Sequence, residues 1–328
     1  TFPLMQVGFL GWSGVDLFFV LSGFLITGIL YEAKGKARYF RNFYARRSLR
    51  IFPLYYLALT VLLVAALALP GLALLGWENS AWLWIYATNY KIAFGEAGMF
   101  GTLDHFWSLA VEEHFYLVWP AIVLAFNRRT LMIIASVAIV IALGVRIACI
   151  QDGEMSMAGY MMTHARMDAL AAGALIALTV RGPRGIKPLA VAAPYVLAAS
   201  GALLAAIVFG RQTTSYHDPL LGTIGLSLLW AFFGSILVLS LTWKPTNFVM
   251  SQPAMRWLGK YSYGLYVWHP PIFIFLLHKE WVHGFRTGNV LLDIAIGVGT
   301  ALAVTLAVSL ASYHLIEKRV LRLKNRFE

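Results

Sequence analysis

The chain has 328 residues, of which 60% are hydrophobic and 12% charged, and it carries a formal net charge of +11. Its mean hydropathy is +0.72. This composition excludes a water-soluble globular protein, because too few polar side chains remain to cover its surface. Apolar segments of about 20 residues recur, which is the length an α-helix needs to cross a bilayer. The sequence therefore predicts an all-α, polytopic transmembrane helix bundle.

Nine transmembrane helices are expected in chain order. They cover residues 12–31, 51–75, 106–126, 130–149, 160–180, 189–209, 219–242, 261–277 and 289–315. No soluble domain, low-complexity tract or internal repeat interrupts them, so residues 1–328 are expected to form one integral membrane domain.

The charges between these spans predict the topology. Alternate gaps hold 20 of the 26 Lys and Arg residues, namely residues 32–50, 127–129, 181–188, 243–260 and 316–328. Cytoplasmic loops carry such an excess of cations, so Thr1 is expected outside and Glu328 in the cytoplasm. Membrane lipids then account for the positive charge, and no nucleic acid partner is predicted.

The amino-terminal residues lack an initiator methionine and show no secretory signal. An external amino end and an odd number of helices predict that one preceding helix is missing, so that the full protein has ten. The single cysteine, Cys149, excludes an intrachain disulfide. No histidine pair has the spacing and acidic neighbours of a metal site, and none is predicted.

Several ionisable residues lie within or at the ends of the apolar spans. A charged side chain near the centre of a bilayer costs roughly 3 kcal/mol on insertion scales, so it usually faces the bundle interior and serves a site. These residues are the best indication of function, and they are Asp16, Glu112, Glu113, Arg166 and Asp168.

Residues 105–120 carry the clearest pattern of this kind. Helical spacing places His105, Ser108, Glu112 and Trp119 along one stripe, whereas Glu113 points about 100° away. A carboxylate in line with a hydroxyl and an imidazole could deprotonate an acceptor hydroxyl or orient the histidine that does so. The alternative is an ion pair that joins two helices.

Two other spans carry buried charge. Asp16 shares a helix face with Gly23 and Thr27, which favours close helix packing, but its own charge requires a partner. Arg166 projects away from the face shared by His164 and Asp168. A structural salt bridge from Arg166 to another helix is the leading interpretation, and the alternative is that it holds an anionic substrate group.

Three further features are candidates for substrate contacts. Arg46, Arg47 and Arg50 converge at helical spacing and suit a phosphate-rich ligand, although topology alone also explains them. The aromatic loop at residues 76–105 could cover a substrate entrance. His269 lies beside prolines that free a backbone carbonyl, so it either lines the cavity or is a satisfied structural histidine.

Six strings of residues, in order along nearly the whole chain, resemble the integral membrane acyltransferase 3 family. They are GVDLFFVLSGFLIT at 14–27, RRSLRIFP at 46–53, FWSLAVEE with FY at 106–116, RMDALAAGA at 166–174, SYGLYVWHP at 262–270 and SYHLIE at 312–317.

The resemblance implies transfer of an acyl group, commonly acetyl from acetyl-coenzyme A, to a hydroxyl of a cell-surface glycan, a lipid-linked sugar, peptidoglycan or occasionally a macrolide. It further implies that the missing first helix carries an Arg and the catalytic His, so this fragment is expected to be inactive. Glu112 and Asp16 match the acidic positions of the family, and the three arginines match its basic motif. His114 departs from the Gln usual at that position.

We therefore expect the missing histidine to act as general base, with Asp16 or Glu112 fixing its tautomer. Coenzyme A would place its phosphates against the three arginines from the cytoplasm, with no resident cofactor. Two other classes stay open. A transporter or flippase would use the buried acids but should show paired broken helices, and a noncatalytic scaffold leaves those acids unexplained.

Overall fold

The computed structural model describes residues 10–68, 79–95, 98–277 and 289–327. The chain forms two compact units. The first unit comprises Thr1–Tyr39, Tyr86–Ala97 and Trp107–Ser251, and the second comprises Phe40–Ile85, Gly98–Phe106 and Gln252–Glu328. Each unit is described by itself.

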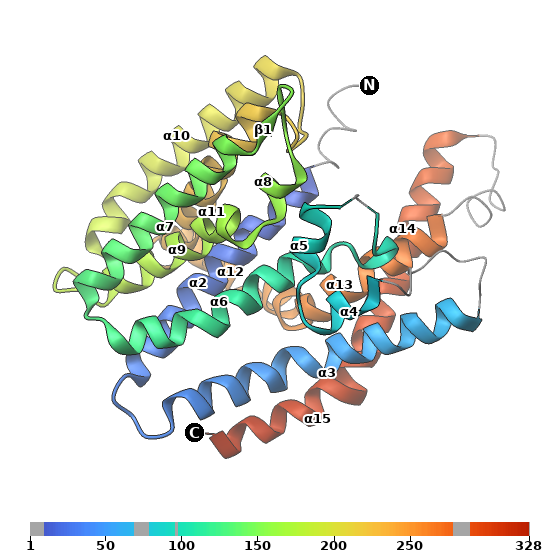
Figure 1. Ribbon diagram of the computed structural model, residues 1–328, viewed down its shortest axis with the longest axis horizontal. Coiled ribbons are helices and arrows are strands. Elements are labelled where there is room, and N and C mark those ends of the chain that lie inside the picture. The colour runs from blue at the N-terminus through green and yellow to red at the C-terminus, as the bar shows by residue number, and fades with distance from the viewer. Residues whose placement is uncertain (1–9, 69–78, 96–97, 278–288, 328) are drawn as a thin grey trace. The chain divides into compact units, whose positions relative to one another are not determined.

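The first unit is built almost entirely of helices, with one short antiparallel hairpin (Figure 1). Its elements are η1 (Leu10–Ser13), α2 (Gly14–Ala33), α5 (Thr88–Ala93), α6 (Phe106–Ala125, from Trp107 onward), α7 (Arg128–Ala148), β1 (Ile150–Gln151), β2 (Glu154–Met155), α8 (Met157–Met161), α9 (Thr163–Val180), α10 (Lys187–Arg211), η4 (Leu221–Gly225), α11 (Leu226–Thr242) and α12 (Lys244–Met250).

The second unit is also helical. Its elements are α3 (Tyr39–Ala68, from Phe40 onward), α4 (Ser80–Trp84), η3 (Gly101–Leu103), α13 (Pro253–Leu277), α14 (Val290–Ser312), η6 (Tyr313–Glu317), α15 (Lys318–Leu321) and η7 (Arg322–Phe327). From α14 to η7 the helical segments follow one another without a break in sequence.

The predicted all-α polytopic bundle is confirmed. Within the described ranges, seven helical segments are long and apolar enough to cross a membrane. The other two predicted spans, 160–180 and 261–277, coincide with α9 and α13, which are helical but carry more polar residues. The second helix begins at Tyr39, twelve residues before its predicted start at 51, and residues 69–75 of that span lie outside the described residues.

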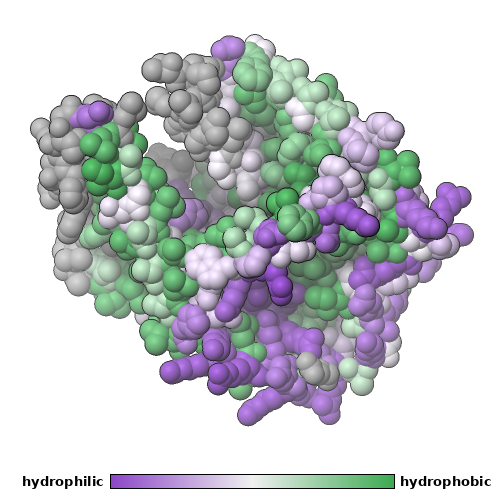
Figure 2. All heavy atoms as spheres, turned by 180° about the vertical axis from the view of Figure 1, so that it is seen from behind, coloured by the Kyte–Doolittle hydropathy of each residue, from purple (hydrophilic) through white to green (hydrophobic). Residues whose placement is uncertain are grey.

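Apolar side chains cover much of the surface in Figure 2. They are the side chains that helices present to lipid, where no water is available to form hydrogen bonds with polar groups. On α10, for example, Val191, Leu203 and Phe209 are exposed. The chain is an integral membrane protein.

Glycines let α2 and α9 pack against each other at close range. A Cβ atom added to Gly23 would lie 2.0 Å from the carbonyl oxygen of Leu170, and one added to Gly173 would lie 2.1 Å from that of Val20. Only a residue without a side chain fits where two backbones approach so closely. The packing role predicted for Gly23 is confirmed.

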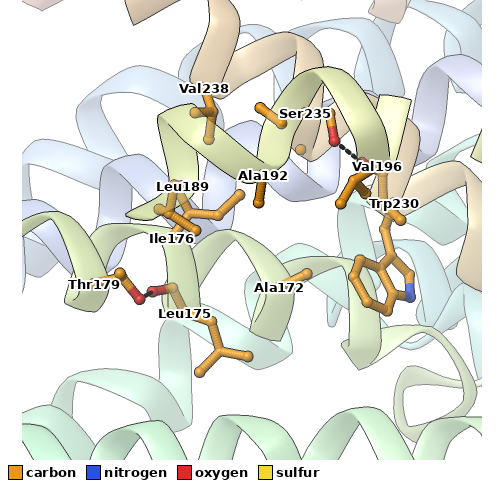
Figure 3. Close-up of a pocket in the computed structure, with 13 residues that line it drawn as sticks. Ala172, Leu175, Ile176, Thr179, Leu189, Ala192, Val196, Trp230, Ser235 and Val238 are labelled. Atoms are coloured by element: carbon orange, nitrogen blue, oxygen red, sulfur yellow. Dashed lines mark hydrogen bonds between the residues drawn. The ribbon is translucent and has the colours of Figure 1, made fainter. Parts of the chain in front are cut away.

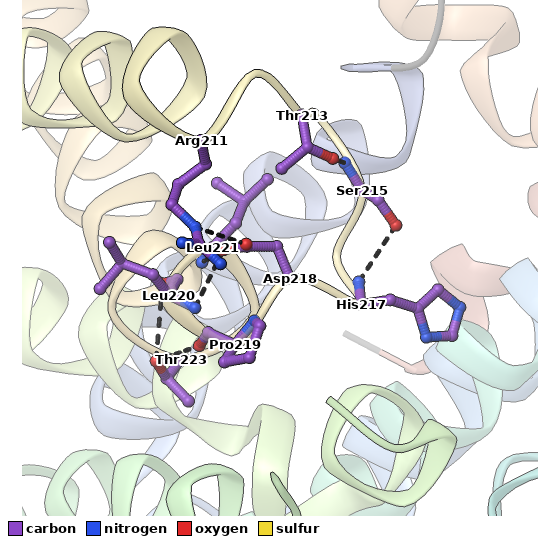
Figure 4. Close-up of polar contacts among 9 residues, drawn as sticks. All are labelled: Arg211, Thr213, Ser215, His217, Asp218, Pro219, Leu220, Leu221 and Thr223. Carbon is purple, nitrogen blue, oxygen red and sulfur yellow. Dashed lines mark hydrogen bonds and ion pairs between the residues drawn. The ribbon is translucent and has the colours of Figure 1, made fainter. Parts of the chain in front are cut away.

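The connection from α10 to η4 is fixed by its own polar groups (Figure 4). Helix α10 ends at Gln212, whose φ of 52° places it in the left-handed region. The Asp218 carboxylate accepts hydrogen bonds from the backbone N–H groups of Leu220 and Leu221 at 3.0 Å and from Arg211 Nε at 2.8 Å. Asp218 thereby satisfies N–H groups that the next helix leaves without partners at its first turn.

Candidate functional site

Asp16 and Arg166 form a buried ion pair between α2 and α9. Arg166 Nη2 donates to Asp16 Oδ1 at 2.8 Å, and the side chains are 0% and 1% exposed. The guanidinium carbon also lies 5.1 Å from the ring centroid of Tyr160 and 5.9 Å from that of Trp107. The salt bridge predicted for Arg166 is therefore present, and a role in binding substrate stays a prediction.

This pair retains hydrogen-bonding capacity. Among the described residues, Asp16 Oδ2 and Arg166 Nε and Nη1 are buried without a hydrogen-bond partner. Leaving such atoms unsatisfied is costly, and native proteins rarely do so without a functional reason. Asp16 thus has one oxygen engaged by Arg166 and one oxygen available to another donor.

Glu112 lies in a separate network of hydroxyl groups. Ser22 Oγ, on α2, donates to Glu112 Oε1 at 2.5 Å, and Tyr116 OH, one turn along α6, donates to the same oxygen. Ser22 Oγ and Tyr116 OH are also 2.7 Å apart. Glu112 is 2% exposed, and the contact with Ser22 connects it to α2.

The predicted stripe on α6 does face the bundle interior. Ser108 is 1% and Trp119 5% exposed, and Trp119 Nε1 donates to Thr27 Oγ1 of α2 at 2.8 Å. The stripe thus packs along α2 through Glu112 and Trp119. His105 belongs to the second unit, so it is described with that unit.

Helix α2 places the two acids at different depths. Asp16 and Ser22, the partner of Glu112, are six residues apart, which corresponds to a rise of about 9 Å. Such a separation does not let two carboxylates share one proton. The arrangement is therefore an ion pair and a carboxylate with hydroxyl partners, which contact α2 at two different depths.

A second buried ion pair was missed by the sequence analysis. Arg146 Nη1 donates to Asp168 Oδ2 at 2.7 Å and to the Ala165 carbonyl at 2.8 Å, and Arg146 Nη2 donates to Ser227 Oγ at 2.7 Å. Arg146 is fully buried. The signal was available, because an arginine inside an apolar span requires an acid, and Asp168 was one of the few acids in such spans.

His164 and Asp168 were expected on one face of a helix. Asp168 is engaged by Arg146, while the ring of His164 stacks against that of Tyr90 with centroids 6.3 Å apart. The two residues therefore have different partners. His114, which replaces the usual Gln of the family, places Nδ1 2.7 Å from Thr163 Oγ1, so an imidazole makes a polar contact to α9 there.

In the second unit, His105 and His269 lie together, with ring centroids 5.6 Å apart. His269 Nδ1 is 2.9 Å from the carbonyl oxygen of Tyr266, the group that Pro270 leaves without its helical N–H partner. A carbonyl only accepts, so Nδ1 carries a proton and donates it to this contact. The interpretation of His269 as a satisfied structural histidine is supported, and its cavity-lining role stays a prediction.

The three arginines Arg46, Arg47 and Arg50, named here the arginine cluster, lie on α3 of the second unit. Two are half-buried and Arg50 is exposed. Glu317 of η6 lies in electrostatic range of Arg50. Trp84 of the aromatic loop stacks on Tyr56 of α3 with ring centroids 5.5 Å apart, which fixes α4 on α3. Its role as an entrance cover stays a prediction.

A cavity of about 190 Å³ lies among α9, α10 and α11 (Figure 3). Its lining is apolar apart from Trp230 and the hydroxyls of Thr179 and Ser235, which donate to carbonyls of their own helices. No charged residue lines it. This cavity cannot perform acid–base chemistry, and it contains neither Asp16 nor Glu112.

Comparison with known proteins identifies the family. The sequence profile of the acyltransferase domain family matches residues 1–313. The chain is 30% identical over 282 residues to the peptidoglycan O-acetyltransferase OatA of Listeria monocytogenes, covering 80% of this chain and 45% of that protein. It is 27% identical over 338 residues to "Putative peptidoglycan O-acetyltransferase YrhL" of Bacillus subtilis, covering 94% of this chain and 50% of that protein.

The chain therefore spans about half the length of the curated relatives it matches. No solved structure matches it. The profile match over almost the whole chain agrees with the order of motifs and with the buried acids of α2 and α6. The chain belongs to the acyltransferase domain family.

Proposed function

We propose that this protein is a membrane O-acetyltransferase of the bacterial cytoplasmic membrane that moves an acetyl group from acetyl-coenzyme A to a hydroxyl of peptidoglycan or a related cell-surface glycan. The acceptor oxygen forms a bond to the acetyl carbon, the carbon–sulfur bond breaks, and coenzyme A leaves as the thiol with the acceptor's proton. The observation that carries this proposal is the buried carboxylate of Glu112 in a chain whose relatives are named for peptidoglycan O-acetylation.

Asp16 on α2 would orient the general base. The general base would be a histidine, as the family resemblance implies. Asp16 Oδ2 is buried without a hydrogen-bond partner in the described part of the chain, so it is available to accept an imidazole N–H. Such a contact fixes the tautomer of the histidine and stabilises its protonated form.

Glu112 would orient the acceptor hydroxyl. Its Oε1 is held by the hydroxyls of Ser22 and Tyr116, which restricts the carboxylate to one orientation. A carboxylate so held is preorganised to orient an acceptor hydroxyl.

The donor would be bound separately. The arginine cluster supplies guanidinium groups suited to the phosphates of coenzyme A, and the alternation of basic loops supports a cytoplasmic position. Donor and acceptor would then meet from opposite sides, so neither has to cross the membrane.

The test is acetyl transfer by the complete natural protein in vesicles, with labelled acetyl-coenzyme A and peptidoglycan fragments. Glu112→Gln should lower the rate by roughly 10²–10⁴-fold, the usual contribution of a positioned acid–base group. Glu113→Gln is the matched control, because its side chain leaves the same helix in another direction and should keep most of the activity.

Wild-type activity in a folded Glu112→Gln protein would remove Glu112 from the mechanism. Accumulation of a solute without formation of labelled ester would instead favour the transporter class.

A further inference from the structure

The carboxyl-terminal helical segment lies antiparallel along the amino-terminal half of α3, within the second unit. At one end the guanidinium carbon of Arg41 lies 5.5 Å from the ring centroid of Phe327. At the other end Glu317 is in electrostatic range of Arg50. Figure 1 shows α15 beside this part of α3.

The spacing of these contacts agrees with one continuous interface. Arg41 and Arg50 are nine residues apart, a rise of about 14 Å in an α-helix. Glu317 and Phe327 are ten residues apart, a rise of about 15–20 Å for a segment that is α-helical and then 3₁₀-helical. The two segments therefore match in length and run in opposite directions.

Lys324 lies between the two ends of this interface. It is half-buried and in electrostatic range of all three members of the arginine cluster. Four cations from two helical segments thus lie within electrostatic range of Lys324 or are Lys324 itself, and Glu317 lies in electrostatic range of Arg50 at one end. Figure 2 shows hydrophilic side chains gathered along the edge where Figure 1 places α15 and the start of α3.

Bringing like charges together costs free energy that grows as the side chains leave water. A phosphate-bearing ligand offsets that cost, because it accepts charge-assisted hydrogen bonds from several cations at once. Guanidinium groups bind two phosphate oxygens each, while the Lys ammonium acts as a compact point charge. The chemistry of the cluster therefore fits a ligand with more than one phosphate.

We propose that Lys324 and the arginine cluster form one phosphate-binding site, to which the carboxyl-terminal segment contributes the fourth cation. The assignment of those phosphates to the acyl donor rests on the proposed function. The segment from Glu317 to Phe327 is then part of the donor site, and its docking on α3 determines whether that site is complete.

The test is binding of adenosine 3′,5′-bisphosphate to the complete protein in a neutral detergent, measured by calorimetry. Lys324→Gln should weaken binding by about tenfold, as expected for the loss of a charge-assisted contact. Arg322→Gln is the matched control, since Arg322 is an exposed cation of the same segment two residues away and should change binding by less than about twofold. Lys324→Arg should restore binding, because it restores the charge.

A lipid headgroup offers the same phosphate chemistry. Wild type and Lys324→Gln are therefore also compared in phosphatidylcholine nanodiscs with and without phosphatidylglycerol, and the phosphatidylglycerol that stays bound to the purified protein is measured. If Lys324→Gln leaves bisphosphate binding unchanged and lowers only the amount of bound phosphatidylglycerol, the donor assignment is overturned and the ligand is lipid. Unchanged binding of both probes in a folded Lys324→Gln protein overturns the site itself.

The binding assay requires no turnover, so it separates this inference from the proposed function. A protein that binds the bisphosphate through Lys324 but forms no ester contradicts only the function. A protein that forms ester with the same apparent KM for acetyl-coenzyme A in wild type and Lys324→Gln contradicts only the site.

Discussion

Replacing Asp168 by Asn should destabilise the first unit by about 3 kcal/mol, because it leaves the Arg146 guanidinium charged and buried without an acid. The two side chains are 0% and 1% exposed, so solvent does not screen the pair. Loss of one partner of a buried pair costs about 3–5 kcal/mol.

We expect a loss at the lower end of the range of about 3–5 kcal/mol, because Asp168→Asn leaves other contacts of Arg146 in place. Arg146 keeps its hydrogen bonds to the Ala165 carbonyl and to Ser227 Oγ, and the Asn carbonyl can still accept from Nη1. By contrast, an ordinary side-chain hydrogen bond inside a membrane protein is worth on average about 0.6 kcal/mol. The measured value therefore distinguishes an uncompensated charge from a lost hydrogen bond.

The assay is unfolding by sodium dodecyl sulfate in mixed micelles, followed by tryptophan fluorescence. The double variant Arg146→Met, Asp168→Leu removes both charges and should recover most of the lost free energy of unfolding. Glu32→Gln is the control, because the side chains of its ion pair are partly exposed, Arg181 by 24% and Glu32 by 64%, and the pair should contribute less than about 1 kcal/mol. A loss below about 1 kcal/mol for Asp168→Asn would refute the reasoning.

Two further predictions use the same protein. Gly173→Val should destabilise the packing of α2 on α9 by several kcal/mol in the same titration, because its Cβ would lie 2.1 Å from the Val20 carbonyl oxygen. Gly144→Val is the control, because a Cβ at that position meets no atom within 4 Å. Equal losses of free energy in the two variants would contradict the packing argument. Burial raises the pKa of Asp218, but the Leu221 N–H and Arg211 outweigh it and hold that pKa below its ordinary value. Asp218 should therefore stabilise the fold above about pH 4, the pKa of an unfolded Asp, and lose this effect as the pH falls through the lower, folded pKa. Thermal unfolding of wild type and Asp218→Asn across that range should converge at acid pH, and a constant difference would contradict it.

The spans were predictable from sequence because a bilayer imposes one strong requirement. Each crossing segment must be apolar and satisfy its own backbone groups, so hydropathy alone indicates where helices lie. The start of α3 was wrong by twelve residues because the segment from Tyr39 is amphipathic and basic, and its helix continues beyond the apolar region. Hydropathy indicates which residues cross the bilayer, but it does not indicate where a helix begins outside the bilayer.

The partners of the buried charges were only partly predictable. Helical spacing correctly placed Glu112 and Trp119 on one interior face, since that is a property of a single helix. It could not show that Ser22, from another helix, is the partner of Glu112. Tyr116, four residues after Glu112, lies on the same face and could have been found by spacing, but a tyrosine in an apolar span is common at membrane interfaces and gave no distinct signal.

The pairing of the charges bears on which acid can act in catalysis. Asp168 is paired with Arg146, whose other donors hold Ala165 and Ser227, so this pair connects α7, α9 and α11 and suits a structural role. Asp16 and Arg166, by contrast, retain buried donors and acceptors without partners in the described part of the chain. Because an unsatisfied buried polar atom costs about 1–3 kcal/mol, a fold retains several in one place only where another group satisfies them in the working protein. The Asp16–Arg166 pair is therefore where a further polar group, such as water or a polar group of a substrate, has a reason to bind.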